Sequence, residues 1–428
     1  MNPFAIAAKG KGFKNALARA RVITARYGLT SHKMDNILER FARLLQTYNA
    51  SATFPITAVA LRRNSATIQK LAQQGIEFAI HGYTHIDHSR LTAEEQVARL
   101  NQAIAAFETS QVSFRGFRCP YLRWNEGTLT ALRYHRFLYD SSQGLTWNVL
   151  NGYDTPAYQR VINFYGAREA SSYPALPSFQ DGLVRIPYCL PDDEGLIDRL
   201  QLASMKAQSE IWLNILEQTY KLGELFTLGL HPERIDLLKE PLAATLAQAR
   251  SLSPAVWVAR LDEIATWWLE RTETKLTITP STHPDQFEVR VDGAKSVTVL
   301  ARNLEVAGPT RPWFDQYDQV MSKTFTIAAT QRPVIGISPQ SAKALVDFLR
   351  QQGYLIEISK DSHNYPLYLH HPEFKPEDER PLLGKIENGS WPLLRLGRWP
   401  NGARSALCVT GDIDALTLWD YGLRTLNK

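Results

Sequence analysis

Most of the first 270 residues alternate between short apolar runs and longer segments in which apolar residues recur every three or four positions. The apolar runs predict buried strands at residues 52–57, 77–80, 113–117, 136–140, 182–187, 225–230 and 255–259. The periodic segments predict amphipathic helices at residues 30–48, 65–74, 92–107, 202–221 and 262–272, preceded by a basic helix at 11–27. Strands that alternate with helices are typical of a parallel α/β architecture.

The pattern changes in the last third of the chain. Short alternating or β-branched runs predict a small antiparallel β module over residues 273–332. The dipeptide Asp292-Gly293 joins two of these runs and predicts a hairpin between them. Residues 333–359 predict one strand–helix–strand unit, whereas residues 360–400 predict irregular structure because they are rich in proline, histidine and charged side chains.

Composition and charge narrow the class of protein. Of the 428 residues, 44% are hydrophobic and 21% are charged, which is typical of a globular chain of two or three domains. The net charge of +5 is spread without a dense basic run, so nucleic acid is not an expected partner. Three distant cysteines imply no disulfide framework. Because no stretch predicts a signal peptide or a membrane span, we expect a cytoplasmic protein.

Polar side chains follow four of the apolar runs directly. They are His81 and His85 after residues 77–80, Arg118 after 113–117, His231 after 225–230, and Asp412 with Asp414 after the apolar run SALCV at 405–409. Each has an ordinary structural explanation when taken singly, as a surface ion pair, a helix cap or a turn. Because active sites of parallel barrels gather at the carboxyl ends of the strands, their shared position favours one common site.

These residue types together suit metal-assisted hydrolysis. Two histidines and one carboxylate leave a coordination position open for water, as a catalytic zinc ion requires. A second carboxylate could accept the proton of that water, and a histidine across the site could protonate the leaving group. An arginine beside the base would favour its ionised form.

Three motifs resemble those of polysaccharide deacetylases, the NodB-homology domain of carbohydrate esterase family four. HGYTH (81–85), FRCPY (117–121) and LGLH (228–231) occur in the order of that family, and the resemblance covers roughly residues 30–270. The resemblance implies an α/β fold of the distorted (β/α) barrel type. Two positions depart from the family pattern. Gly82 replaces a serine or threonine, and Cys119 stands where proline is more common, either as a packed thiol or as a group that disturbs the metal.

The family's aspartate pair is missing from its usual place. It should precede the helix at 30–48, where the sequence offers only Asp35, but TGDIDA at 410–415 resembles it. We interpret the chain as a circularly permuted domain whose first strand is supplied by the C-terminus. The predicted division is a barrel at 1–272, a β module at 273–332, an α/β and irregular segment at 333–402, and the completing strand at 403–428.

The resemblance also implies roles for single residues. The metal ligands would be His81, His85 and Asp414, with zinc as the first choice and cobalt, nickel or iron as alternatives. Asp412 would be the general base, Arg118 would position it, the backbone N–H of Tyr121 would help to hold the oxyanion, and His231 would be the general acid. Asp192 and Asp193 either line this site or belong to a solvated loop.

The implied activity is metal-dependent hydrolysis of an N-acetyl or O-acetyl group on a sugar or glycan precursor. One alternative on the same fold is hydrolysis of a small or cyclic amide. Another is a catalytically inactive barrel that binds carbohydrate, with Trp124, Trp147 and Trp313 as stacking platforms. The second alternative would gain support if Asp412 and Asp414 lay far from the histidines.

Overall fold

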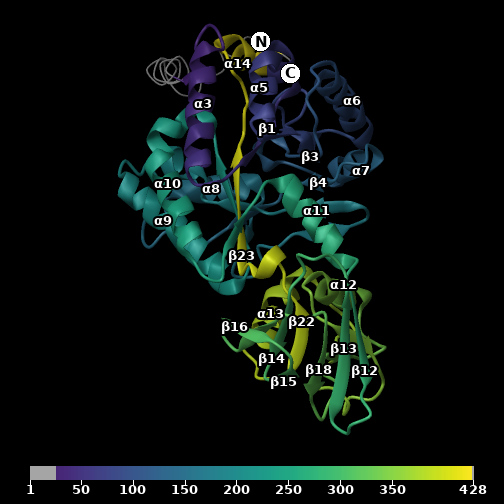
Figure 1. Cartoon of the computed structure of the whole chain (residues 1–428). Helices are drawn as coiled ribbons and strands as arrows, with labels where there is room; N and C mark the ends of the chain where they lie inside the picture. The colour runs from purple at the N-terminus through teal and green to yellow at the C-terminus, as the bar shows by residue number, and fades with distance from the viewer. Residues whose placement is uncertain (1–25, 427–428) are drawn as a thin grey trace.

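The computed structural model of the chain describes residues 26–426 (Figure 1). The helix predicted at 11–27 therefore lies almost entirely outside the described residues. Figure 1 shows two bodies, a larger one in which helices surround a sheet and a smaller one that is rich in strands. The C-terminal segment, drawn in yellow, runs from the smaller body back through the larger one.

The larger body is built on a sheet of twelve strands. Eleven of them follow one another in the order β6 (Arg168–Glu169), β5 (Gly144–Thr146), β9 (Tyr188–Leu190), β10 (Leu225–Leu230), β23 (Ser405–Gly411), β1 (Ala52–Ile56), β2 (Glu77–Ile80), β3 (Gly116–Phe117), β4 (Tyr139–Asp140), β8 (Leu183–Arg185) and β7 (Ser178–Gln180). The twelfth strand, β11 (Val256–Val258), also pairs with β23, and only β7 and β8 pair antiparallel. The α/β fold of the distorted barrel type is confirmed. The sheet stays open because its end strands, β6 and β7, do not pair with each other in the described part of the chain.

Strand β23 lies in the middle of this sheet although it comes near the end of the chain. It pairs in parallel with β10 from Leu225↔Ala406 to Leu230↔Gly411, and with β1 at Ala52↔Val409 and Thr53↔Thr410. All seven of its residues are buried. This burial explains the apolar run SALCV, because a strand with neighbours on both sides and cover on both faces has little contact with water.

Helices cover the sheet at positions that local sequence signals explain. They are α3 (His32–Thr47), α4 (Ala58–Arg63), α5 (Ser65–Gln73), α6 (Ala93–Thr109), α7 (Glu126–Tyr134), α8 (Pro156–Tyr165), α9 (Met205–Leu222), α10 (Ile235–Ser251), α11 (Leu261–Thr272) and α14 (Leu418–Leu426). Thr92 and Glu95 form a capping box at the start of α6, and α9 ends at Gly223 in the left-handed conformation, with φ of 69°. Among the described residues, every helix is too short or too polar to cross a bilayer.

The smaller body contains three sheets and two helices. The first sheet has the order β12 (Lys275–Pro280), β13 (Gln286–Asp292), β18 (Thr324–Ala328), β15 (Glu305–Ala307). The second has the order β16 (Thr310–Phe314), β17 (Tyr317–Val320), β14 (Val299–Arg302), β22 (Leu393–Leu396). The third has the order β20 (Ile356–Ile358), β19 (Ile335–Ile337), β21 (Leu367–Leu369), and the helices are α12 (Lys343–Gln351) and α13 (Glu379–Glu387). Parallel pairing of β19 with β20 across α12 matches the predicted strand–helix–strand unit.

The hairpin predicted at Asp292-Gly293 is wrong. The strand before this dipeptide, β13, pairs with β12 and β18, whereas the next strand, β14, pairs with β17 and β22 in another sheet. The burial patterns give the reason, because β14 is buried at all four positions and β13 is buried on one face only. Gly293 is needed for close packing, since a Cβ there would lie 2.5 Å from Thr274 Oγ1.

The β module predicted at 273–332 and the segment predicted at 333–402 are not separate in space, because their strands are interleaved. Strand β22, from the segment at 333–402, pairs with β14 of the predicted β module over four residues. Residues 360–400 are also less irregular than predicted, because they form β21, α13 and β22. Their periodicity is hard to detect since each element is short and α13 carries Pro381 and Gly384.

The segment just before β23 ties the two bodies together. The indole N–H of Trp267 donates to the Arg398 carbonyl oxygen at 2.9 Å, and Arg271 Nη1 donates to the same oxygen at 3.2 Å. The indole N–H of Trp399 donates to the Gly223 carbonyl oxygen at 3.0 Å. Strand β23 therefore starts from a point that helices α9 and α11 hold in place.

We predict that Leu407→Ala in β23 lowers the free energy of unfolding by about 2–5 kcal/mol, because it opens a cavity at a fully buried position of the central strand. Urea unfolding followed by tryptophan fluorescence measures the change. The matched control is Leu237→Ala, at a position that is 52% exposed, where the change should stay within about 0.5 kcal/mol. Equal effects at the two positions would contradict the central placement of β23.

Candidate metal and catalytic site

Two histidines extend from the carboxyl end of β2. The backbone N–H of His81 donates to the Ile56 carbonyl oxygen at 2.9 Å, and Gly82 then turns the chain with φ of 79°, a conformation that favours glycine. His81 Nδ1 lies 2.8 Å from the carbonyl oxygen of Arg118. Because a carbonyl oxygen only accepts, Nδ1 carries a proton, and in the neutral imidazole Nε2 keeps its lone pair for a metal.

Strand β23 brings a carboxylate to these histidines. Asp414 Oδ1 lies 3.5 Å from His81 Nε2 and 3.2 Å from His85 Nε2. One ligand atom from each of these three buried residues lies within 4.8 Å of the other two. Two imidazoles and one carboxylate that converge in this way fit a divalent metal such as zinc and leave room for a further ligand.

The second carboxylate of the pair, Asp412, lies beside the buried guanidinium of Arg118. Arg118 Nη1 donates to Asp412 Oδ1 at 2.7 Å and to Thr410 Oγ1 at 2.9 Å. Burial alone would lower the pKa of Arg118, but the Asp412 carboxylate outweighs this effect and raises the pKa, so the guanidinium stays charged. Asp412 Oδ2 lies 4.0 Å from His81 Nε2, so Asp412 is held near the histidines by the arginine.

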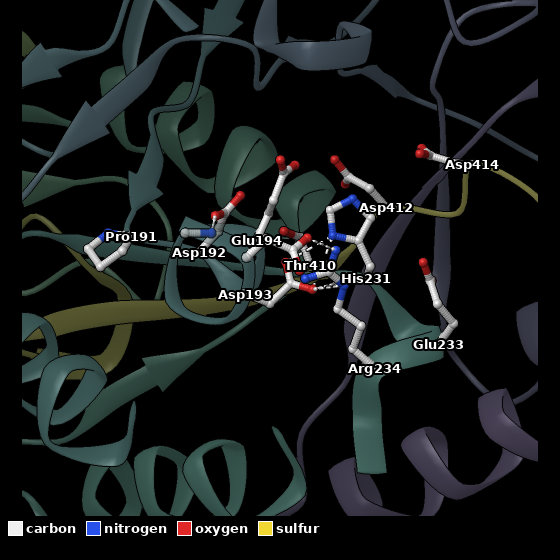
Figure 2. A network of polar contacts seen from close by, with 12 residues as sticks. Pro191, Asp192, Asp193, Glu194, His231, Glu233, Arg234, Thr410, Asp412 and Asp414 are labelled. Carbon is white, nitrogen blue, oxygen red and sulfur yellow. Dashed lines mark hydrogen bonds and ion pairs between the residues drawn. The ribbon is translucent and has the colours of Figure 1, made fainter. Parts of the chain in front are cut away.

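His231 follows β10 and makes its closest polar contact with a residue from another loop. Its Nδ1 lies 2.9 Å from Asp193 Oδ1, and its backbone N–H donates to Asp193 Oδ2 at 2.9 Å (Figure 2). Arg234 Nε lies 3.4 Å from the same carboxylate. Burial would lower the pKa of His231, but the charge of Asp193 outweighs it and raises the pKa well above the ordinary value. The Asp193 carboxylate therefore favours the protonated imidazolium form of His231.

The sequence did not identify Asp193 as the partner of His231. Asp192 and Asp193 follow the apolar strand β9. This position indicated that they could line the site, but it was equally compatible with a solvated loop. Both side chains are buried, so the solvated loop is wrong. Asp192 accepts a hydrogen bond from the Tyr188 hydroxyl at 2.9 Å. Burial, with the neighbouring Asp193 carboxylate, raises the pKa of Asp192 to about 7.

Cys119 and Tyr121 follow Arg118 on the same loop. Cys119 is fully buried, and burial raises the pKa of its thiol well above the ordinary value, so it is a neutral packed side chain. Tyr121 has φ of 59°, a left-handed conformation that is strained for an aromatic residue. Its ring contacts His85 edge-on, with centroids 4.3 Å apart.

The three tryptophans considered as stacking platforms are occupied by other contacts. Trp147 is only 3% exposed. The Arg185 guanidinium lies 4.0 Å from the centre of a Trp124 ring, and that of Arg404 lies 5.4 Å from the centre of a Trp313 ring. Because Asp412 and Asp414 also lie near the histidines, the specific argument for an inactive binding barrel is lost.

Parts of this chain are similar to known proteins in sequence and in structure. Residues 27–139 match the family model described as polysaccharide deacetylase. A bifunctional xylanase/deacetylase of Pseudobutyrivibrio xylanivorans is 32% identical over 84 residues, 19% of this chain and 14% of that protein. A peptidoglycan deacetylase-like protein, FGM2, of Gibberella zeae is 32% identical over 108 residues, 25% of this chain and 27% of that protein.

A solved structure of a probable polysaccharide deacetylase from Pseudomonas aeruginosa PAO1 superposes with a TM-score of 0.43 at 21% identity, covering 54% of this chain and 72% of that one. In the two sequence comparisons, the matched part of the chain spans less than a third of the length of either curated relative. The range matched by the family model includes His81, His85, Arg118 and Tyr121, but not His231, Asp412 or Asp414. Over residues 27–139 this chain is therefore similar to the polysaccharide deacetylase family.

Proposed function

We propose that this protein is a metal-dependent deacetylase that hydrolyses an N-acetyl or O-acetyl group on a sugar or glycan precursor. The observation that carries the proposal is the convergence of Asp414, from the C-terminal strand, with His81 and His85 of the family-matched segment. The names of the two curated relatives, a xylanase/deacetylase and a peptidoglycan deacetylase-like protein, support a carbohydrate substrate.

His81, His85 and Asp414 would hold the divalent metal. The convergence of their ligand atoms and the hydrogen bond that fixes the His81 tautomer both support this role. A divalent cation bound there would supply a Lewis acid that polarises the substrate carbonyl and acidifies water. Zinc is our first choice for a site of two imidazoles and one carboxylate, and cobalt, nickel or iron are alternatives.

Asp412 would act as the general base. Its carboxylate takes a proton from the attacking water while the water oxygen forms a bond to the acetyl carbonyl carbon. Arg118 orients this carboxylate through the 2.7 Å hydrogen bond and balances its charge. The backbone N–H of Tyr121 would donate to the oxygen that becomes negatively charged.

His231 would act as the general acid. As the carbon–nitrogen bond breaks, it donates its proton to the leaving amine, which yields acetate and the free amino sugar; for an O-acetyl group the proton goes to the alcohol oxygen. Asp193 supports this role because it accepts from Nδ1 and favours the imidazolium, so that the other ring nitrogen carries the proton to be transferred.

We further propose that the domain is circularly permuted, with β23 as the first strand of the family fold. The parallel pairing of β23 with β1 supports this interpretation, because TGDIDA then directly precedes the helix–strand unit of α3 and β1 in space. Permutation preserves the contacts of a fold when the joined ends lie close together at the surface.

We predict that the 428-residue protein, purified without chelator and supplied with zinc, contains about one metal equivalent per chain. His85→Ala should lose most of it, because only two of the three ligands remain. Elemental analysis measures the content. The control is His283→Ala at an exposed position of the smaller body, which should keep the metal. Wild-type protein that takes up neither zinc nor cobalt would contradict the proposed function.

We predict that Asp412→Asn and Asp414→Asn separate the two roles of the aspartate pair. Asp412→Asn should keep the metal and lose deacetylase activity by about 10²-fold or more, because the amide cannot accept the proton. Asp414→Asn should lose both metal and activity, because an amide is a weaker ligand. Metal analysis and turnover on an acetylated glycan measure the two effects, and equal metal loss in both variants would overturn the assignment.

We predict that Asp193→Asn shifts the alkaline limb of the kcat/KM profile to lower pH. The Asp193 carboxylate raises the pKa of His231, so without it the imidazolium loses its proton at lower pH. A general acid is active only when protonated, and activity is therefore lost as pH rises through its pKa. Metal content should not change. An unmoved alkaline limb would show that His231 is not the acid.

A further inference from the structure

A pocket with a basic wall lies at the amino ends of the strands, at the other end of the sheet from the candidate metal site. Its volume is about 410 Å³, and its walls include three arginines, Arg115, Arg133 and Arg136, and one acidic residue, Asp181. Arg115 directly precedes β3, whereas Arg118 of the candidate metal site directly follows it. A concave pocket of this size is typical of a small-molecule site, and its residues are not those that the proposed deacetylase reaction uses.

Helix α7 ends beside this pocket in a turn that usually contains glycine. The Phe137 N–H donates to the Leu132 carbonyl oxygen at 3.1 Å, and the Arg136 N–H donates to the Arg133 carbonyl oxygen at 3.0 Å, the two hydrogen bonds of a Schellman motif. Arg136 takes the left-handed position of the motif, with φ of 56°, which glycine occupies with less strain. Arg133 in the last turn already supplies the cation that a helix C-terminus favours. The turn alone therefore does not account for an arginine at position 136.

The arginines are held close together by the backbone, and one of them lacks a full set of partners. The Leu138 N–H donates to the Arg115 carbonyl oxygen at 2.9 Å and so joins the segment before β3 to the segment before β4. The Arg133 side chain is only 27% exposed, and its Nη2 lies 3.3 Å from Oδ2 of Asp181, whose side chain is 68% exposed. Within the described part of the chain, Arg133 Nε has no hydrogen-bond partner. Because an ion pair with an exposed carboxylate is weak, this guanidinium is poorly compensated for its burial.

The charges of the pocket select the ligand. Three guanidiniums and one carboxylate leave an excess of two positive charges. A phosphate monoester carries between about one and a half and two negative charges at pH 7 and offers three strong acceptor oxygens. Guanidinium groups bind phosphate well because their paired N–H donors match two phosphate oxygens. Phe114 and Phe137 of the same pocket, with ring centroids 5.5 Å apart, supply an apolar wall beside the charged one.

We propose that this pocket binds a small organic phosphate, with the phosphate group on the three arginines and the organic part against Phe114. Its volume suits such a molecule better than a single inorganic ion. The inference is independent of the proposed deacetylase function, because it rests on residues at the other end of the sheet and is tested by binding alone.

Isothermal titration calorimetry of the 428-residue protein tests the pocket, with phenyl phosphate, inorganic phosphate and benzoate as probes. We expect phenyl phosphate to bind more tightly than the other two, because it alone combines the dianion with an apolar body. The double variant Arg115→Gln/Arg136→Gln should lower its affinity about tenfold or more, because two charge-assisted contacts are lost. Both side chains are exposed, so the melting temperature should stay close to that of the wild type.

Asp181→Asn should have the opposite effect and tighten phenyl phosphate binding about threefold, because it removes the negative charge beside Arg133. Asparagine tolerates the left-handed backbone of this position, with φ of 49°. The matched control is Arg290→Gln, which makes the same charge change at an exposed position of β13 and should leave the affinity unchanged.

Three results would overturn the proposal. They are a wild type that does not bind phenyl phosphate at millimolar concentration, an unchanged affinity in the double variant, and weaker binding in Asp181→Asn. Inorganic phosphate that binds as tightly as phenyl phosphate would contradict the organic part of the ligand, and benzoate that binds as tightly would contradict the phosphate group. If the double variant does not fold, the direction of the Asp181→Asn effect decides. Deacetylase activity and metal content should be the same in all these variants as in the wild type.

Discussion

The parallel pairing of β23 between β1 and β10 positions both carboxylates of the candidate site. Beyond the strand, the backbone is held on both sides, because the Asp412 N–H donates to the Leu230 carbonyl oxygen at 2.9 Å and the Ile413 N–H donates to the Pro55 carbonyl oxygen at 2.7 Å. Asp412 and Asp414 are therefore placed by the backbone of the sheet and not by a loop free to move. A central strand with saturated hydrogen bonds is among the least mobile parts of a fold, which suits groups that must keep catalytic geometry.

The same strand makes the burial of Arg118 tolerable. A fully buried guanidinium costs several kcal/mol in lost hydration unless its donors are satisfied. Arg118 meets this requirement with Asp412 and Thr410 of the β23 segment and with Ser141, whose carbonyl and hydroxyl oxygens both accept. The ring of Tyr188 lies 4.6 Å from the guanidinium carbon. The Asp412 carboxylate thus contributes to stability as well as to the proposed catalysis, because its loss would leave a buried charge unpaired.

The sequence predicted those parts of the protein that local patterns specify. The alternation of strands and helices, the capping box at Thr92 and the histidine motif are all local signals. The position of Asp412 and Asp414 beside the histidines could be predicted for two reasons only. SALCV is apolar enough for a central strand, and TGDIDA resembles a family motif. Asp193 could not be assigned to His231, since 38 residues separate them and no local signal encodes the contact. The Asp292-Gly293 hairpin failed for the same reason, because burial of β14 against β22 outweighs a favourable turn sequence.

The register of the sheet connects these observations. Leu230 of β10 is paired with Gly411 of β23, and Ile80 of β2 is paired with Phe117 of β3. The next residues along these four strands are His231, Asp412, His81 and Arg118, four of the residues in the proposed site. A slip of one residue in β23 would turn Asp412 to the opposite face of the sheet and move every side chain of the strand into the space of its neighbour. The backbone pairing of β23 with β1 and β10 therefore also brings the proposed acid, base and metal ligands into one site.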